Sequence, residues 1–93
     1  MVRKSKAFVT QKHLHDGKAQ LRFLADAFET GDPDVIAHAV GMVVAIRGRT
    51  DIADFSGLGR VTVYRALKPG GNPTLRTLIA LLNTMNIKLT VKT

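Results

Sequence analysis

The fold is decided by the stretch RTDIADFSGLGRVTVYRALK, which covers residues 49–68 of the 93-residue chain. Its pattern predicts two short helices that cross at about 90–120° around a tight turn, which is the arrangement of a helix-turn-helix. Ala53 is small enough for the crossing point, and Gly57 suits the positive φ of the turn. The inner positions that fix this crossing are predicted to be Ile52, Ala53, Gly57, Leu58 and Val63.

The outward positions of the second helix carry side chains that can contact DNA. In a helix-turn-helix the second helix presents its N-terminal residues to base edges, while the first helix crosses the phosphate backbone. Arginine can donate two hydrogen bonds to guanine, and valine or the threonine methyl can contact thymine. The predicted base-reading residues are Arg60, Val61, Thr62 and Arg65. The predicted phosphate contacts are Arg49, Thr50, Tyr64 and Lys68, with backbone N–H groups near Thr50.

The charge balance indicates a polyanionic partner. The chain has 14 Lys plus Arg against 7 Asp plus Glu, a net charge of +7 and a pI near 10.4. Such a surface attracts nucleic acid or an anionic membrane. The outward face of the second helix of the motif contains no acidic residue. A basic face on an ordinary αα-hairpin is often only solvated, but the motif and the basic chain together favour double-stranded DNA.

Outside the motif, the sequence predicts three further helices. Apolar residues at helical spacing place them at 17–29, 33–47 and 72–86. Asp32-Pro33 and Asn72-Pro73 each supply an N-cap residue followed by a proline, which is tolerated at the first helical position. Apolar residues surround almost the whole of the helix at 33–47, so we expect it to be the buried centre of the domain.

The end of the chain predicts a short C-terminal β-strand. Ile87, Leu89 and Val91 alternate with polar residues, which is the pattern of a strand with one buried face. A lone strand is not stable, so this one needs the N-terminal segment, a second subunit or another protein. In the preceding helix, Leu81 and Met85 lie off the main apolar stripe, which leaves open whether they form a dimer contact or pack within the monomer.

The length and the charge distribution indicate one folded domain preceded by a basic N-terminal segment. Residues 1–15 carry four basic and no acidic residues, and we expect them to be extended or flexible. This segment is an arm toward DNA phosphates, a docking strand for a partner, or a solvated tail. Residues 16–93 are the predicted helix-turn-helix domain, with the motif itself at 49–68.

Several classes of protein are disfavoured by what the sequence lacks. The chain has no cysteine, and His13 and His15 beside Asp16 lack the further ligands that a metal site needs. No serine lies in a nucleophile-elbow pattern, so we expect no enzyme activity, no cofactor and no metal. There is no apolar run of membrane-spanning length and no signal-peptide pattern, so we expect a cytoplasmic protein without a membrane partner.

Five segments of the chain resemble the addiction-module antidote proteins, which are antitoxins with a phage-repressor-like (XRE/HigA-type) helix-turn-helix. The segments are AFETGD (27–32), AVGMV (39–43), IADFSGLGRVTVYRAL (52–67), GNPTLRTL (71–78) and IKLTV (87–91). The resemblance implies a mainly α fold, a five-helix phage-repressor-like domain with a short C-terminal β-strand. It also implies a homodimer that represses its own operon and neutralises a RelE/ParE/HigB-like toxin, as part of a type II toxin–antitoxin module.

Two other functions stay open from the sequence. The protein could be a stand-alone helix-turn-helix transcriptional regulator, or a protein-interaction module without DNA activity whose terminal strand adds to a partner sheet. A small basic protein encoded in the neighbouring reading frame would favour the antitoxin.

Overall fold

The computed structural model describes residues 16–93, and within them the chain is mainly α-helical. The predicted segment 1–15 lies outside the described residues. Five helices follow one another: α2 (Gly17–Glu29), α3 (Pro33–Arg47), α4 (Arg49–Ser56), α5 (Arg60–Leu67) and α6 (Leu75–Thr84). The prediction of a mainly α fold with five helices is confirmed for this part of the chain, and the bounds of α2 and α3 agree with the predicted 17–29 and 33–47.

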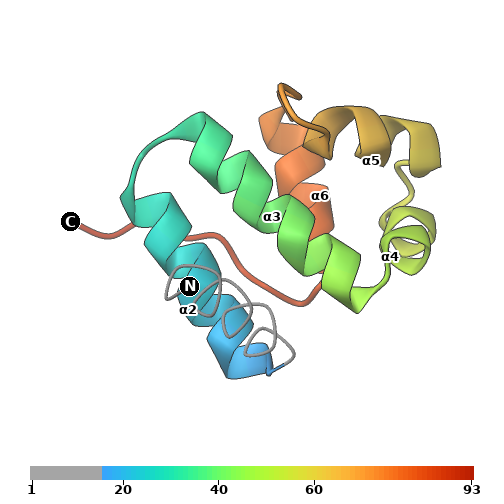
Figure 1. The fold of residues 1–93 in the computed structure, drawn as a ribbon. Coiled ribbons are helices and arrows are strands. Elements are labelled where there is room, and N and C mark those ends of the chain that lie inside the picture. The colour runs from blue at the N-terminus through green and yellow to red at the C-terminus, as the bar shows by residue number, and fades with distance from the viewer. Residues whose placement is uncertain (1–15) are drawn as a thin grey trace, which may run out of the picture.

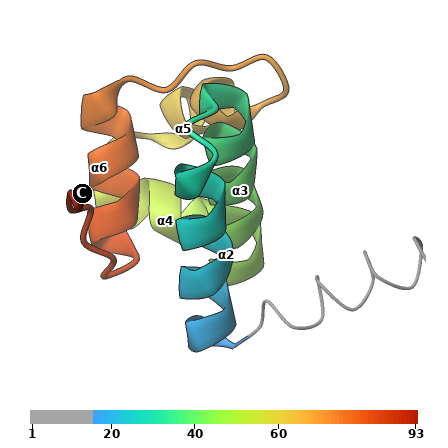
Figure 2. The ribbon, with the colours of Figure 1, turned by 90° about the vertical axis from the view of Figure 1, so that its left-hand side faces the viewer.

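Helix α3 is the centre of the arrangement. It packs against α2 on one side and against α4 and α5 on the other, while α6 packs on α4. Figure 1 shows α3 running between α2 and the α4–α5 pair, and the turned view in Figure 2 shows α2 and α3 side by side, with α6 at the left of the view. Two long helices therefore form the scaffold on which the two short ones are held.

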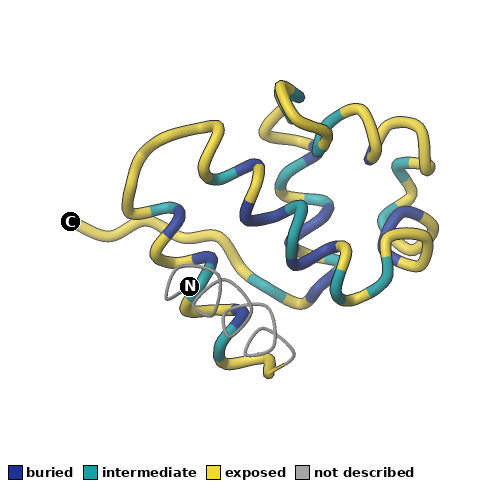
Figure 3. Tube along the Cα trace, viewed as in Figure 1, coloured by how far each residue is buried: buried dark blue, intermediate teal, exposed yellow. Residues whose placement is uncertain are grey.

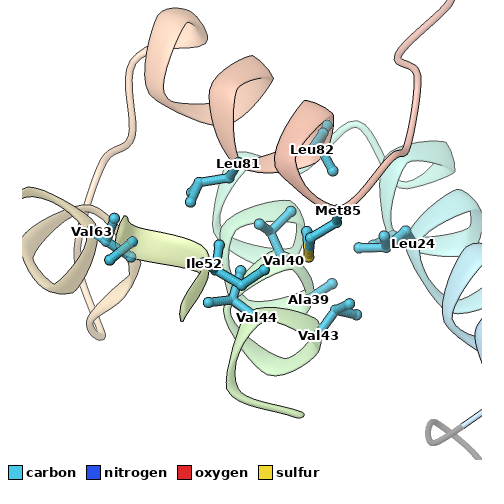
Figure 4. Close-up of a cluster of buried hydrophobic side chains, with 12 residues drawn as sticks. Leu24, Ala39, Val40, Val43, Val44, Ile52, Val63, Leu81, Leu82 and Met85 are labelled. Atoms are coloured by element: carbon cyan, nitrogen blue, oxygen red, sulfur yellow. The ribbon is translucent and has the colours of Figure 1, made fainter. Parts of the chain in front are cut away.

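The hydrophobic core lies where α3, α4 and α6 meet (Figure 4). Val40, Val43 and Val44 of α3 are completely buried, as the prediction of a buried centre requires, and Leu81 of α6 is buried with them. In Figure 3 the buried positions line the inner sides of the helices, whereas the connecting loops and the C-terminal segment are exposed. The core reaches the short helices through Ile52 and Val63.

Arg47 ties three helices together at the end of α3. Its Nε donates a hydrogen bond to Gln20 Oε1 of α2 at 2.8 Å, and its Nη1 donates to the carbonyl oxygen of Met85, just after α6, at 2.7 Å. Gln20 is buried whereas Arg47 is exposed, so this part-buried contact lies at the edge of the core. These two hydrogen bonds fix the end of α3 against α2 and α6. Helix α4 begins after one intervening residue.

Side-chain caps begin helices α2, α3 and α6. Asp32 accepts hydrogen bonds from the N–H groups of Asp34 and Val35, with Pro33 at the first position of α3, as the sequence predicts. Helix α6 differs from its prediction, because Thr74 and not Asn72 is its N-cap and accepts a hydrogen bond from the N–H of Thr77 at 3.1 Å. Residues 72–74 stay extended because the chain must cross from the end of α5 to α6.

The open question about the apolar face of α6 is answered in favour of packing within the monomer. Leu81 and Met85, the two residues off the main stripe, are 0% and 3% exposed and belong to the core. Leu75 and Ile79, which the periodicity places on the buried stripe, are 65% and 38% exposed. The buried side of α6 is therefore rotated relative to the predicted one.

The predicted C-terminal β-strand is not formed, since residues 16–93 contain no strand in the structure. Helix α6 ends in a Schellman motif, in which Asn86 is left-handed (φ 62°) and the Ile87 N–H donates to Leu82 O at 2.8 Å. Ile87 packs against the core, whereas Val91 is 93% exposed. The segment runs along α2, where Lys92 pairs with Glu29, and no neighbouring strand within 16–93 is available for it to pair with.

Candidate nucleic-acid interface

Helices α4 and α5 are joined by a turn of three residues, 57–59, inside the predicted motif. Gly57 has a φ of 76° and Gly59 a φ of 85°, a left-handed region that side chains other than glycine rarely adopt. Ser56 closes the turn, because its Oγ donates to Ala53 O at 2.9 Å and accepts from the Leu58 N–H at 3.2 Å. The turn conformation is thus set by two glycines and one serine hydroxyl.

The five predicted inner residues lie on the packed side of this pair or in its turn. Ile52 and Ala53 of α4 are 7% and 1% exposed, and Val63 of α5 is 1% exposed. Leu58 is half-buried against the core, and Gly57 forms the left-handed end of α4. The side of α5 that carries Val63 therefore determines how the helix sits on the scaffold.

The four predicted base-reading residues are all on the exposed side of α5. Arg60, Val61, Thr62 and Arg65 are exposed, although Val63 between them is buried. Val61 leaves 63% of its surface in solvent, so its side chain contributes little to the core and is accessible to a partner. The structure thus presents two guanidinium groups and a β-branched apolar residue on one short helix.

Three of the four predicted phosphate-contacting residues line a common cleft. Arg49, Tyr64 and Lys68 border a cleft of about 320 Å³ between α3 and α5, whereas exposed Thr50 does not contribute to it. His38 of α3 lines the same cleft and was not among the predicted residues. A signal for it exists in the sequence, because His38, Gly41, Met42 and Ala45 follow one another at helical spacing and all line the cleft.

The first turns of α4 and α5 have no side-chain cap. The N-cap residues are Gly48 and Gly59, in contrast to the aspartate and threonine caps of α2, α3 and α6. Uncapped N–H groups at a helix start attract anions, although Asp51 lies in the first turn of α4. Helix α5 has no acidic residue in its first turn.

Asp54 is a second residue that the sequence reasoning missed. Its carboxylate accepts from Arg60 Nε at 3.4 Å and from Arg60 Nη2 at 3.3 Å, so that α4 and α5 are linked across the exposed side of the turn. The separation of six residues across a tight turn is the sequence signal for this contact. The base-reading candidate Arg60 is therefore not a free side chain in this structure.

The pKa shifts among the described residues belong to side chains on another part of the surface. A hydrogen bond from Lys92 at 2.7 Å lowers the pKa of Glu29, and the same contact raises the pKa of Lys92. Residues 16–93 contain no group of His, Asp and Glu side chains arranged to hold a metal ion. None of their helices has the length and apolar character required to span a membrane.

Comparison with known proteins identifies the family of the chain through one family model. The chain is 26% identical over 92 residues to an uncharacterized protein of Haemophilus influenzae, with 99% of this chain and 95% of that protein covered. No solved structure matches the chain. The family model described as "Probable addiction module antidote protein" matches residues 4–93, which is nearly the whole chain. The chain therefore belongs to this family of addiction module antidote proteins.

Proposed function

We propose that this protein is the antitoxin of a type II toxin–antitoxin module, that it binds DNA sequence-specifically through α4 and α5, and that it represses its own operon. The observation that carries the DNA-binding part is the exposed side of α5. It presents Arg60, Val61, Thr62 and Arg65 to solvent around the buried Val63. In this role the protein is a binding protein, and it needs neither catalysis nor a cofactor.

The base contacts follow from the chemistry of these side chains. An arginine can donate two parallel hydrogen bonds to guanine O6 and N7 in the major groove, and each such pair discriminates by about 1–3 kcal/mol. Arg60 and Arg65 are candidates for two such contacts. Val61 and the Thr62 methyl group are exposed beside these arginines and suit the methyl group of thymine.

The phosphate contacts are proposed for the side chains around α4 and the cleft. Arg49, Tyr64 and Lys68 lie around one cleft, and the uncapped N–H groups at the start of α4 are next to Arg49 and Thr50. Such contacts fix the register of the protein on the duplex without reading sequence. The net charge of +7 supplies the long-range attraction.

We further propose that the protein acts as a homodimer on a two-fold operator. Leu75 and Ile79 of α6 are exposed, four residues apart, and are apolar surface that a second copy could cover. The two half-sites should then be separated by about 34 Å, one turn of the duplex. A sedimentation measurement that finds only monomers at micromolar concentration, with and without operator, would contradict this part.

The DNA-binding proposal is tested with the DNA directly upstream of its own reading frame. Footprinting at low salt should show a protected two-fold site, and the affinity should fall steeply as salt is raised. Lys68→Ala should lower the slope of log affinity against log salt by about 1, because one phosphate contact is lost. Lys88→Ala, in the C-terminal segment, is the matched control and should leave the slope nearly unchanged. The absence of any protected site would refute the proposal.

The antitoxin part is tested with the neighbouring reading frame. The proposal expects a small toxin of the RelE/ParE/HigB kind to be encoded there and to be bound by this chain. Expression of that frame alone should arrest growth, and co-expression of the antitoxin should restore it. A neighbour that neither arrests growth nor copurifies with this chain would instead favour a stand-alone transcriptional regulator.

A further inference from the structure

Asp54 and Arg60 form a contact that stability does not explain. Their side chains are 53% and 67% exposed, and their closest oxygen and nitrogen atoms are 3.3 Å apart. Exposed ion pairs of this kind stabilise a fold very little, because water and salt screen them. A carboxylate beside a proposed DNA-binding surface should also repel phosphates. Neither stability nor attraction of phosphate therefore accounts for this contact.

The geometry of the contact leaves one side of the guanidinium group available. Asp54 accepts from Nε and Nη2, which is one lateral edge of the planar group. Arginine has five N–H donors, and this pairing uses one on Nε and one on Nη2. The remaining donors are on Nη1 and on the far side of Nη2. They form the terminal edge, which matches the two acceptors O6 and N7 of guanine.

We infer that Asp54 is a positioning residue, which holds Arg60 so that its terminal edge faces a guanine in the major groove. This inference rests on the proposed DNA binding by α5. Arg60 is the first residue of α5, and a long side chain at that position has many rotamers in solvent. Anchoring the guanidinium from α4 reduces the number of orientations that must be lost on binding, and it selects the orientation that reads guanine.

The inference predicts that neutralising Asp54 lowers specificity for guanine without lowering affinity for unrelated DNA. Asp54→Asn removes the negative charge and weakens the anchor, so preference for guanine at the position read by Arg60 should fall severalfold. Binding to unrelated sequences should become stronger or stay the same, because a repulsive charge is gone. A residue that only supported the fold would weaken binding to all sequences together.

Asp51→Asn is the matched control. Asp51 is exposed on the same helix and its substitution removes the same charge, but its carboxylate does not contact Arg60. The control should raise affinity for all sequences about equally and keep the base preference of the wild type. Thermal unfolding of Asp54→Asn should match that of the wild type, which separates a positioning effect from a folding defect. Asp51→Asn should melt slightly lower, because it removes a favourable charge from the first turn of α4.

The experiment measures competition binding to operators in which each base pair is changed in turn. The expected result is that Asp54→Asn lowers the guanine preference at one position per half-site, and has no further effect in an Arg60→Ala background. An unchanged preference in Asp54→Asn, or an effect that persists without Arg60, would overturn the inference while leaving DNA binding intact. Failure of the wild type to distinguish any operator from random DNA would overturn the proposed function as well.

Discussion

The two sides of α5 differ sharply in how far they are buried. On the packed side, Val63 is 1% exposed and the end of the helix touches Gly41 and Gly71. On the other side, Val61 and Tyr64 are each 63% exposed. The packed side fixes where the helix lies, and the exposed side contributes little to folding. Residues on the exposed side can therefore change with little effect on stability, which leaves them available for binding.

The largest expected difference involves the two glycines beside the packed side of α5. A Cβ atom on Gly71 would lie 2.5 Å from Ala66 O and 2.6 Å from Arg65 O, whereas one on Gly41 would lie 3.6 Å from Leu67. Gly71→Ala should therefore lower the free energy of unfolding by about 1–3 kcal/mol, because backbone must move. Gly41→Ala should raise it by up to about 1 kcal/mol, since alanine favours the helix and fits.

Urea unfolding of the two glycine variants measures this difference. A loss of stability in Gly71→Ala would show that backbone atoms lie too close to residue 71 for a Cβ atom. A gain in Gly41→Ala would show that alanine fits there and favours the helix. If both substitutions lowered the free energy of unfolding equally, α3 and α5 would pack more tightly at Gly41 than they do in the structure.

The next expected effect compares two valines that are two residues apart. Val63→Ala should lower the free energy of unfolding by about 2 kcal/mol, because buried methyl groups are lost and a cavity is left. Val61→Ala should change it by less than about 0.5 kcal/mol, as most exposed substitutions do. Chemical denaturation gives both values, and similar losses for the two variants would contradict the division of α5 into a packed and an exposed side.

The smallest expected effect concerns the exposed ion pair of Glu29 and Lys92. The pKa of Glu29 is lowered by the hydrogen bond from Lys92, so the pair contributes above the unfolded pKa of Glu29 and is lost as pH falls through the folded value. Lys92→Ala should raise the pKa of Glu29 toward its ordinary value, as an NMR titration would show. The melting temperature at neutral pH should not change measurably, because both side chains are largely exposed and water screens their interaction. A clear drop in melting temperature would show that this exposed ion pair stabilises the fold more than we expect.

The parts of the fold that depend on neighbours in sequence could be predicted from the sequence. The bounds of α2 and α3 followed from periodicity and from the Asp32-Pro33 start, because caps and helical spacing are local properties. The burial of Ala53 and Val63 also followed from spacing around Gly57. The DNA contacts assigned to the exposed residues of α5 remain predictions.

The parts that depend on contacts through space could not be predicted in this way. The strand expected from the alternation over 87–92 requires a partner, and alternation alone does not supply one. Asp54 and His38 acquire their neighbours only when α4, α5 and α3 are packed together. The start of α6 moved from Asn72 to Thr74 because the crossing from α5 determines where a new helix can begin.

The most direct test of the central claim, that the exposed side of α5 reads bases, is selection of preferred sequences from a random oligonucleotide pool. The wild type should select a two-fold site whose half-sites are about 34 Å apart. Arg60→Ala and Arg65→Ala should each lose the preference for one guanine per half-site, a loss of about 1–3 kcal/mol, and keep the others. If both variants select the same sequence as the wild type, the base-reading surface lies elsewhere and the claim is wrong.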